Sequence, residues 1–211
     1  MPVDEPIRLG ASDVPEGRPF AHPDRTADDL VSILGMARTL RRILAWPSTS
    51  PAHPSPYTLE VGNEVAPHRV IICDDAALRT ESAPPFVGFF ALKRPGLDNA
   101  PLTEVDDQLV LEFPRHPGIL SYSSIALPDG NWGNLIVLRS VADGERWREG
   151  ERHAWAAREL APAHYSSVRL HSGRFPGGLL SGLEPVLLRT RYFDYRVSSP
   201  WRAERVLGAG D

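Results

Sequence analysis

The stretch ILSYSSIALPDGNWGNLIVLR, residues 119–139, decides the fold that this sequence predicts. Its first half alternates like a strand, with Leu120 and Tyr122 on one face and Ile119 on the other. The Pro-Asp-Gly-Asn run that follows is typical of a tight turn, because Gly and Asn adopt positive φ angles at little cost. The second half is a short apolar strand. We therefore expect an antiparallel hairpin.

Further helices and strands are expected on both sides of this hairpin. They lie at residues 86–92, 103–113, 145–160, 166–175 and 186–196. Thr103 and Asp106 have the spacing of a capping box at the first helix, and Pro162 ends the second. The order strand, helix, strand, strand, helix, strand defines a ferredoxin-like α+β unit, an antiparallel sheet with helices on one face.

A sheet covered on one face needs something to cover the other. Pairing of two sheets across a two-fold axis satisfies this need. We therefore expect a homodimer, in which two copies form a dimeric α/β barrel around a small-molecule pocket.

The chain is divided by composition into three parts. Residues 1–84 form a proline-rich extension, residues 85–197 the ferredoxin-like α/β-barrel domain, and residues 198–211 a tail. Within the extension, apolar residues recur at helical spacing and predict an amphipathic helix at 27–45.

Composition also excludes several classes of protein. The net charge is -4 and the basic residues are scattered, so we expect no nucleic-acid partner. The apolar runs are too short to cross a membrane. A single cysteine, Cys73, and the lack of a signal sequence favour a cytoplasmic location.

Residues 151–175 hold the strongest cluster of reactive side chains. Imidazole transfers protons and binds metals at neutral pH, and several aromatic and basic groups lie beside the histidines. The candidates are His153, Trp155, His164, Tyr165, Arg169 and His171. Arg169 and His171 share a strand face that is suited to an anion or carboxylate.

The other strands carry further candidates. Arg189 and Arg191 share a face of the last predicted strand and provide a second possible anion-binding row. Tyr122 offers a phenol and Asn134 an amide to a pocket, although core packing and a strand-edge hydrogen bond explain them equally well. The sequence contains no Gly-rich phosphate loop, Gly-x-Ser-x-Gly elbow, CxxC pair or HExxH motif.

Residues 86–195 resemble a known superfamily in the order of their elements. The WGNLIVL strand and the helix rich in Trp and His are similar to the antibiotic-biosynthesis-monooxygenase type of dimeric α/β barrel. More narrowly, AHYSSVRLHSG followed by EPVLLRTRYFDY resembles the corresponding end of the bacterial haem-degrading monooxygenases. This resemblance implies that His164 is an axial haem ligand and that Trp155 lies against the macrocycle. Haem is accordingly the one cofactor expected.

Three functions remain open from the sequence. The first is a monooxygenase-like small-molecule oxidoreductase, either with haem on His164 and propionates on Arg169, Arg189 or Arg191, or without a cofactor. In the cofactor-free version His153 or His164 abstracts a substrate proton. The second is a non-redox isomerase, cyclase or dehydratase that uses the same histidines. The third is a non-catalytic ligand-binding protein.

Overall fold

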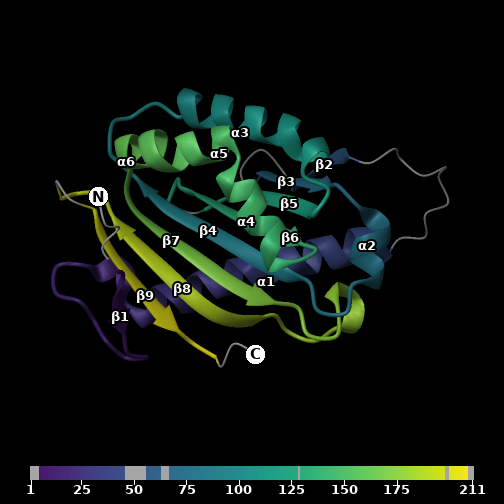
Figure 1. Cartoon of the computed structure of the whole chain (residues 1–211), viewed down its shortest axis with the longest axis horizontal. Coiled ribbons are helices and arrows are strands. Elements are labelled where there is room, and N and C mark those ends of the chain that lie inside the picture. The colour runs from purple at the N-terminus through teal and green to yellow at the C-terminus, as the bar shows by residue number, and fades with distance from the viewer. Residues whose placement is uncertain (1–4, 46–55, 63–66, 128, 198–199, 209–211) are drawn as a thin grey trace.

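The computed structural model describes residues 5–45, 56–62, 67–127, 129–197 and 200–208. They form one mixed sheet of nine strands in the order β1-β9-β8-β7-β4-β6-β5-β3-β2 (Figure 1). The pair β1 and β9 is parallel, and the other neighbouring pairs are antiparallel. The strands are β1 (Ile7–Leu9), β2 (Tyr57–Gly62), β3 (Pro67–Ile72), β4 (Pro85–Lys93), β5 (Ile119–Ala126), β6 (Trp132–Leu138), β7 (Tyr165–Arg174), β8 (Val186–Asp194) and β9 (Trp201–Val206).

Helices lie on both faces of this sheet. They are α1 (Pro23–Ala45), α2 (Asp75–Thr80), α3 (Ala100–Glu112), α4 (Val141–Glu149), α5 (Glu151–Trp155) and α6 (Ala161–His164). A π-helical turn, η3 (Ala156–Leu160), joins α5 to α6, so the helical run continues past Pro162, where its end was predicted. The remaining short turns are η1 (Pro19–Ala21), η2 (Phe113–Arg115) and η4 (Leu179–Ser181). None of the described helices is both long and apolar enough to cross a membrane.

The predicted hairpin is confirmed, because β5 and β6 pair antiparallel along their length. Gly130 has a φ of 79°, as its place in the turn requires. A bulge near the start of β5 shifts the register. Ile119 and Tyr122 therefore pack in one cluster, whereas Leu120 packs on the opposite face. The prediction that Leu120 and Tyr122 lie on the same face of the strand is wrong for this reason.

Helix α1 covers one face of the sheet (Figure 1). Proline suits its first position, since the first N–H of a helix has no partner within the helix. Its buried apolar side chains recur every three or four residues and pack against residues of β3, β4 and β6. The helix residues in this cluster are Ile33, Met36, Ala37, Leu40 and Leu44. The helix predicted at 27–45 is confirmed and begins four residues earlier.

Helices α3 to α6 lie on the opposite face. A smaller apolar cluster joins α3 and α4 to β5 and β6, and it includes Phe113 and the partly buried Trp147 of α4. No residue of α3 to α6, all of which the structure describes, is fully buried. These helices therefore pack less closely on the sheet than α1 does.

The predicted fold class is wrong. A small ferredoxin-like sheet with helices on one face was expected, whereas the sheet has nine strands and helices on both faces. The strands β7, β4, β6 and β5 do lie side by side, but β3 and β2 extend one edge and β8, β9 and β1 the other. Because α1 covers the face expected to be bare, the premise for a dimeric α/β barrel is lost. The sheet also runs across the boundaries predicted at 84/85 and 197/198.

Gly173 lies where β7 and β8 approach closely. A Cβ atom there would lie 2.3 Å from the carbonyl oxygen of Val186 and 2.4 Å from Cζ of the buried Phe86. We expect Gly173→Ala to lower the free energy of unfolding by about 1–3 kcal/mol through this overpacking. Gly35→Ala on α1, where a Cβ meets open space, is the control and is expected to be neutral or stabilising. Equal urea midpoints for the two variants would contradict the packing described.

Candidate functional site

A cavity of about 260 Å³ lies between α3 and the sheet, and strands β2 to β7 contribute to its walls. Two of the residues singled out in the sequence, Tyr122 of β5 and Asn134 of β6, line it. They reach the same side because β5 and β6 pair in a register that aligns Ser124 with Asn134. Ser124 donates a hydrogen bond of 3.0 Å to Oδ1 of Asn134.

Asp106 of α3 joins two of the cavity's polar side chains. The Tyr122 hydroxyl donates to its Oδ1 over 2.5 Å, and the Arg69 guanidinium donates to its Oδ2. Arg69 also donates to Asp107 over 2.9 Å. Burial raises the pKa of Tyr122 to about 12, so the phenol stays protonated at neutral pH. One carboxylate is thus shared between a phenol and a guanidinium.

Several hydrogen-bond donors of the residues that line the cavity have no hydrogen-bond partner among the described residues. They include the side-chain amide NH₂ of Asn134, the hydroxyl of Tyr165 and the hydroxyl of Thr103. Burial raises the pKa of Tyr165 to about 12, so this second phenol is also protonated. The cavity therefore offers donors to an acceptor atom on a bound molecule.

Aromatic rings form the apolar part of the cavity wall. Phe89 of β4 and Tyr165 of β7 meet edge to face, with ring centroids 5.7 Å apart. Trp132 also lines the cavity and is 41% exposed, which places it at the rim. Such rings bind the faces of flat apolar groups.

The histidines on the helical run lie outside this cavity. His153 packs on Trp147, with ring centroids 4.5 Å apart, and burial lowers its pKa. His164, at the end of α6, immediately precedes the cavity residue Tyr165 but does not line the cavity. Its Nδ1 is buried without a partner in the described parts of the chain. Trp155 is 48% exposed on α5.

The two predicted anion-binding rows lie on opposite faces of the sheet. Arg169 and His171 contact α1. Thr190 is paired with His171 in register and faces α1 too, so Arg189 and Arg191 point the other way. Burial and then Arg189 lower the pKa of Arg191. The rows therefore do not combine into one pocket.

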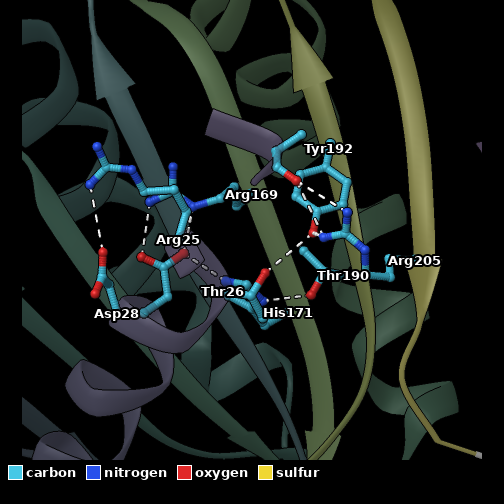
Figure 2. Close-up of polar contacts among 10 residues, drawn as sticks. Arg25, Thr26, Asp28, Arg169, His171, Thr190, Tyr192 and Arg205 are labelled. Atoms are coloured by element: carbon cyan, nitrogen blue, oxygen red, sulfur yellow. Dashed lines mark hydrogen bonds and ion pairs between the residues drawn. The ribbon is translucent and has the colours of Figure 1, made fainter. Parts of the chain in front are cut away.

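Asp29 of α1 is the centre of a buried polar network against β7. Figure 2 shows Arg169, His171 and Thr190 of this network. Its Oδ2 accepts from Nε of Arg169 over 2.5 Å and lies 2.8 Å from Nε2 of His171. Its Oδ1 accepts from Nη2 of Arg169 over 2.9 Å. Burial alone raises the pKa of Asp29, but the hydrogen bonds from Arg169 and His171 outweigh it and lower the pKa.

The network continues to Thr190, whose Oγ1 lies 2.9 Å from Nδ1 of His171. Hydroxyl, imidazole and carboxylate thus follow one another as in the triad of serine hydrolases. His171 and Thr190 are both 0% exposed, however, so no substrate reaches the hydroxyl. We assign this network a structural role in holding α1 on the sheet.

A second, separate group of contacts involves Thr26, Tyr192 and Arg205 (Figure 2). The hydroxyl groups of Thr26 and Tyr192 lie 3.2 Å apart, and Arg205 of β9 donates to Tyr192 over 2.6 Å. Arg205, which is 1% exposed, also donates to the carbonyl oxygens of Gly10 and Asp13. A single buried guanidinium thereby fastens the N-terminal residues to the last strand.

The residues expected to hold haem do not surround one cavity. His164 and Trp155 belong to the helical run, His171 is enclosed under α1, and Arg189 lies on the other face. As placed, they do not form a pocket for the macrocycle. In the described ranges, no group of three or more His, Cys, Asp or Glu side chains is positioned to hold a metal ion.

Sequence reasoning missed Arg69 and Asp106 at the cavity, and it named Tyr165 only as a member of the cluster at 151–175. Thr103 and Asp106 were interpreted as a capping box, which is wrong, because α3 already begins at Ala100. Both residues instead lie within the helix and line the cavity. Their spacing of three residues, which places them on one helix face, was the available signal.

Comparison with known proteins assigns no family. No family model matches the sequence, and no curated protein matches it. A solved structure, that of protein SO0527 from Shewanella oneidensis, has a TM-score of 0.40 and 13% sequence identity to this chain. The match covers 46% of this chain and 93% of that chain. At this level the similarity identifies neither a shared fold nor a function.

Proposed function

We propose that this protein binds a small carbonyl compound in the cavity between α3 and the sheet. The supporting observation is the combination of free donors with aromatic walls. The Tyr165 hydroxyl and the Asn134 amide would donate to the carbonyl oxygen, while Phe89 and Trp132 would contact the flat apolar part. At about 260 Å³ the cavity lies just below the roughly 300–1,000 Å³ usual for drug-sized ligands, so the compound is small.

The same arrangement favours proton transfer next to the carbonyl group. Donors aimed at a carbonyl oxygen stabilise the negative charge that develops when a neighbouring C–H bond loses its proton. Asp106, within 2.5 Å of the Tyr122 hydroxyl, is the carboxylate that would accept a proton. A non-redox isomerase or dehydratase is therefore our second candidate function, with Asp106 and Tyr122 in the place of the histidines.

Oxygenation of a small molecule stays a prediction of the resemblance. In its cofactor-free form it requires a carbanion, which the proposed proton transfer would supply in the same cavity. A cytoplasmic location and a homodimer also stay predictions.

NMR titration with acetophenone and with ethylbenzene tests the binding proposal. The two compounds share a phenyl ring and differ in the carbonyl oxygen. We expect acetophenone to bind more tightly and to shift amide signals of α3, β5 and β6. Tyr165→Phe and Asn134→Leu should each weaken acetophenone binding about threefold to tenfold, the effect of one hydrogen bond, and leave ethylbenzene unaffected.

Tyr195→Phe is the matched control, because this phenol does not line the cavity. It should leave both affinities unchanged. Equal binding of acetophenone and ethylbenzene would rule out carbonyl recognition, and loss of binding in all three variants would point to a general effect on the fold. Between pH 7 and 10 acetophenone affinity should stay constant, since both cavity phenols have a pKa of about 12.

A further inference from the structure

We propose that a second cavity, on the α1 face of the sheet, binds a small oxyanion such as a phosphate or carboxylate group. This cavity has a volume of about 180 Å³ and lies between the start of α1 and the ends of β4 and β7. Ser167, Arg169, Arg25 and Arg196 line it. The sheet separates it from the cavity under α3, so the two sites are independent.

Ser167 carries the first part of the argument. It is 2% exposed, and its Oγ is buried without a hydrogen-bond partner among the described residues. Leaving a buried hydroxyl unpaired is unfavourable, so such a group calls for an explanation. The neighbouring Ser166 differs, because its hydroxyl donates to the carbonyl oxygen of Leu92 over 3.0 Å. An acceptor bound in the cavity would satisfy Ser167.

Two guanidinium groups are held in place beside this hydroxyl. Arg169 uses Nε and Nη2 to bind Asp29, and Arg196 uses Nε and Nη2 to bind Asp194. The Nη1 group of each makes no hydrogen bond to another described residue. Fixed forks of this kind bind oxyanions well, because their donors are already oriented.

Arg25 adds a third positive charge from the first turns of α1. Its closest acidic partner is Asp28, at 3.6 Å, and both side chains are mostly exposed. Among the described residues, Asp129 is the one acidic residue that lines the cavity. The N-terminal end of a 23-residue helix also carries a partial positive charge. Carboxylate partners, Asp28, Asp29 and Asp194, offset the charge of the three arginines, so the donors that remain free are what favours an anion over a neutral ligand.

The apolar lining limits what else the ligand contains. Phe20, Leu92 and Leu127 line the cavity, so a short hydrocarbon part fits beside the anionic group. Within this volume, phosphate and a small carboxylate such as acetate both fit as the source of the oxyanion. The experiment below separates them.

Thermal unfolding at constant ionic strength, with sodium phosphate or sodium acetate replacing sodium chloride, tests the site. A bound anion should raise Tm with a saturating dependence on its concentration. Ser167→Ala should raise Tm of the ligand-free protein, because an unpaired buried hydroxyl is removed, and weaken the apparent anion affinity about tenfold. Arg25→Gln should weaken the affinity by a smaller factor, because this side chain is exposed.

Two matched controls complete the experiment. Ser121→Ala removes another buried hydroxyl that has no partner in the described residues, and Arg38→Gln removes another exposed arginine of α1. Both should leave the anion affinity unchanged. Saturation by phosphate or by acetate identifies the source of the oxyanion. The proposal is overturned if neither anion gives a saturating rise, or if Ser167→Ala and Ser121→Ala bind the anion equally well.

Discussion

Asp29→Asn is expected to lower the free energy of unfolding by about 3–5 kcal/mol, because it leaves the buried Arg169 guanidinium without its counter-charge. The Asp29 side chain is 6% exposed and that of Arg169 is 13% exposed, so water does little to replace the lost carboxylate. His171, at 2.8 Å, loses the same negative partner. Urea denaturation followed by circular dichroism measures the change.

Asp28→Asn is the control for this prediction. It removes a carboxylate from the adjacent position of α1, where the side chain is 68% exposed. We expect its effect to stay within about 0.5 kcal/mol. If both variants had the same stability, Asp29 would not be the buried anchor of α1.

The difference between wild type and Asp29→Asn should also depend on pH. The pKa of Asp29 in the folded protein lies below its usual value of 3.8. A carboxyl group with a lowered folded pKa adds stability that is complete above the unfolded pKa and is lost as pH falls through the folded one. The two proteins should therefore differ most at neutral pH and converge as pH falls below about 4. A difference that widened in acid would contradict the assigned ion pair.

Leu40→Ala is expected to lower the free energy of unfolding by about 2–5 kcal/mol, the second large effect. Leu40 is 0% exposed and packs with residues of the sheet in the main core cluster. Removing its side chain leaves a cavity that the rigid sheet cannot close. Val31→Ala, on the same helix at 69% exposure, should change stability by less than about 0.5 kcal/mol.

This comparison also distinguishes the observed fold from the expected one. If α1 were an arm apart from the sheet and a second copy covered that face, Leu40→Ala and Val31→Ala would have similar small effects on the isolated chain. A large and specific loss in Leu40→Ala, independent of protein concentration, is the result that the present fold predicts.

Local structure was predicted correctly where the sequence has a regular spacing of apolar residues or a clear turn signal. The hairpin had its Gly-Asn turn, and α1 had apolar residues at helical spacing. Both signals arise within one segment, so they do not depend on the rest of the chain. Neither signal shows which face of the sheet α1 covers. Because that face was expected to be bare, a dimer was predicted.

The last strand, β9, was missed because its alternation of apolar and polar side chains breaks at Arg205. In β9 the inward position after Ala203 is Arg205, a basic residue that is 1% exposed. Its burial depends on Tyr192 and on carbonyl oxygens near residue 10, which are remote in sequence. Pairing of this kind is visible only once the chain is folded.

The candidate site was predicted in part. Tyr122 and Asn134 line the cavity, but the residue that organises it, Asp106, was assigned to the start of a helix. The histidines attracted attention for their chemistry, yet His171 is enclosed by Asp29 and Thr190. Residue type alone does not separate a buried structural imidazole from a reactive one.

A crystal structure of the protein with acetophenone tests the central claim most directly. We predict that the ligand lies between α3 and the sheet, with its oxygen within hydrogen-bond distance of Tyr165 or Asn134 and its ring near Phe89. Electron density for the ligand at any other place, with the α3 cavity empty at a concentration that saturates the NMR titration, would contradict the proposed function.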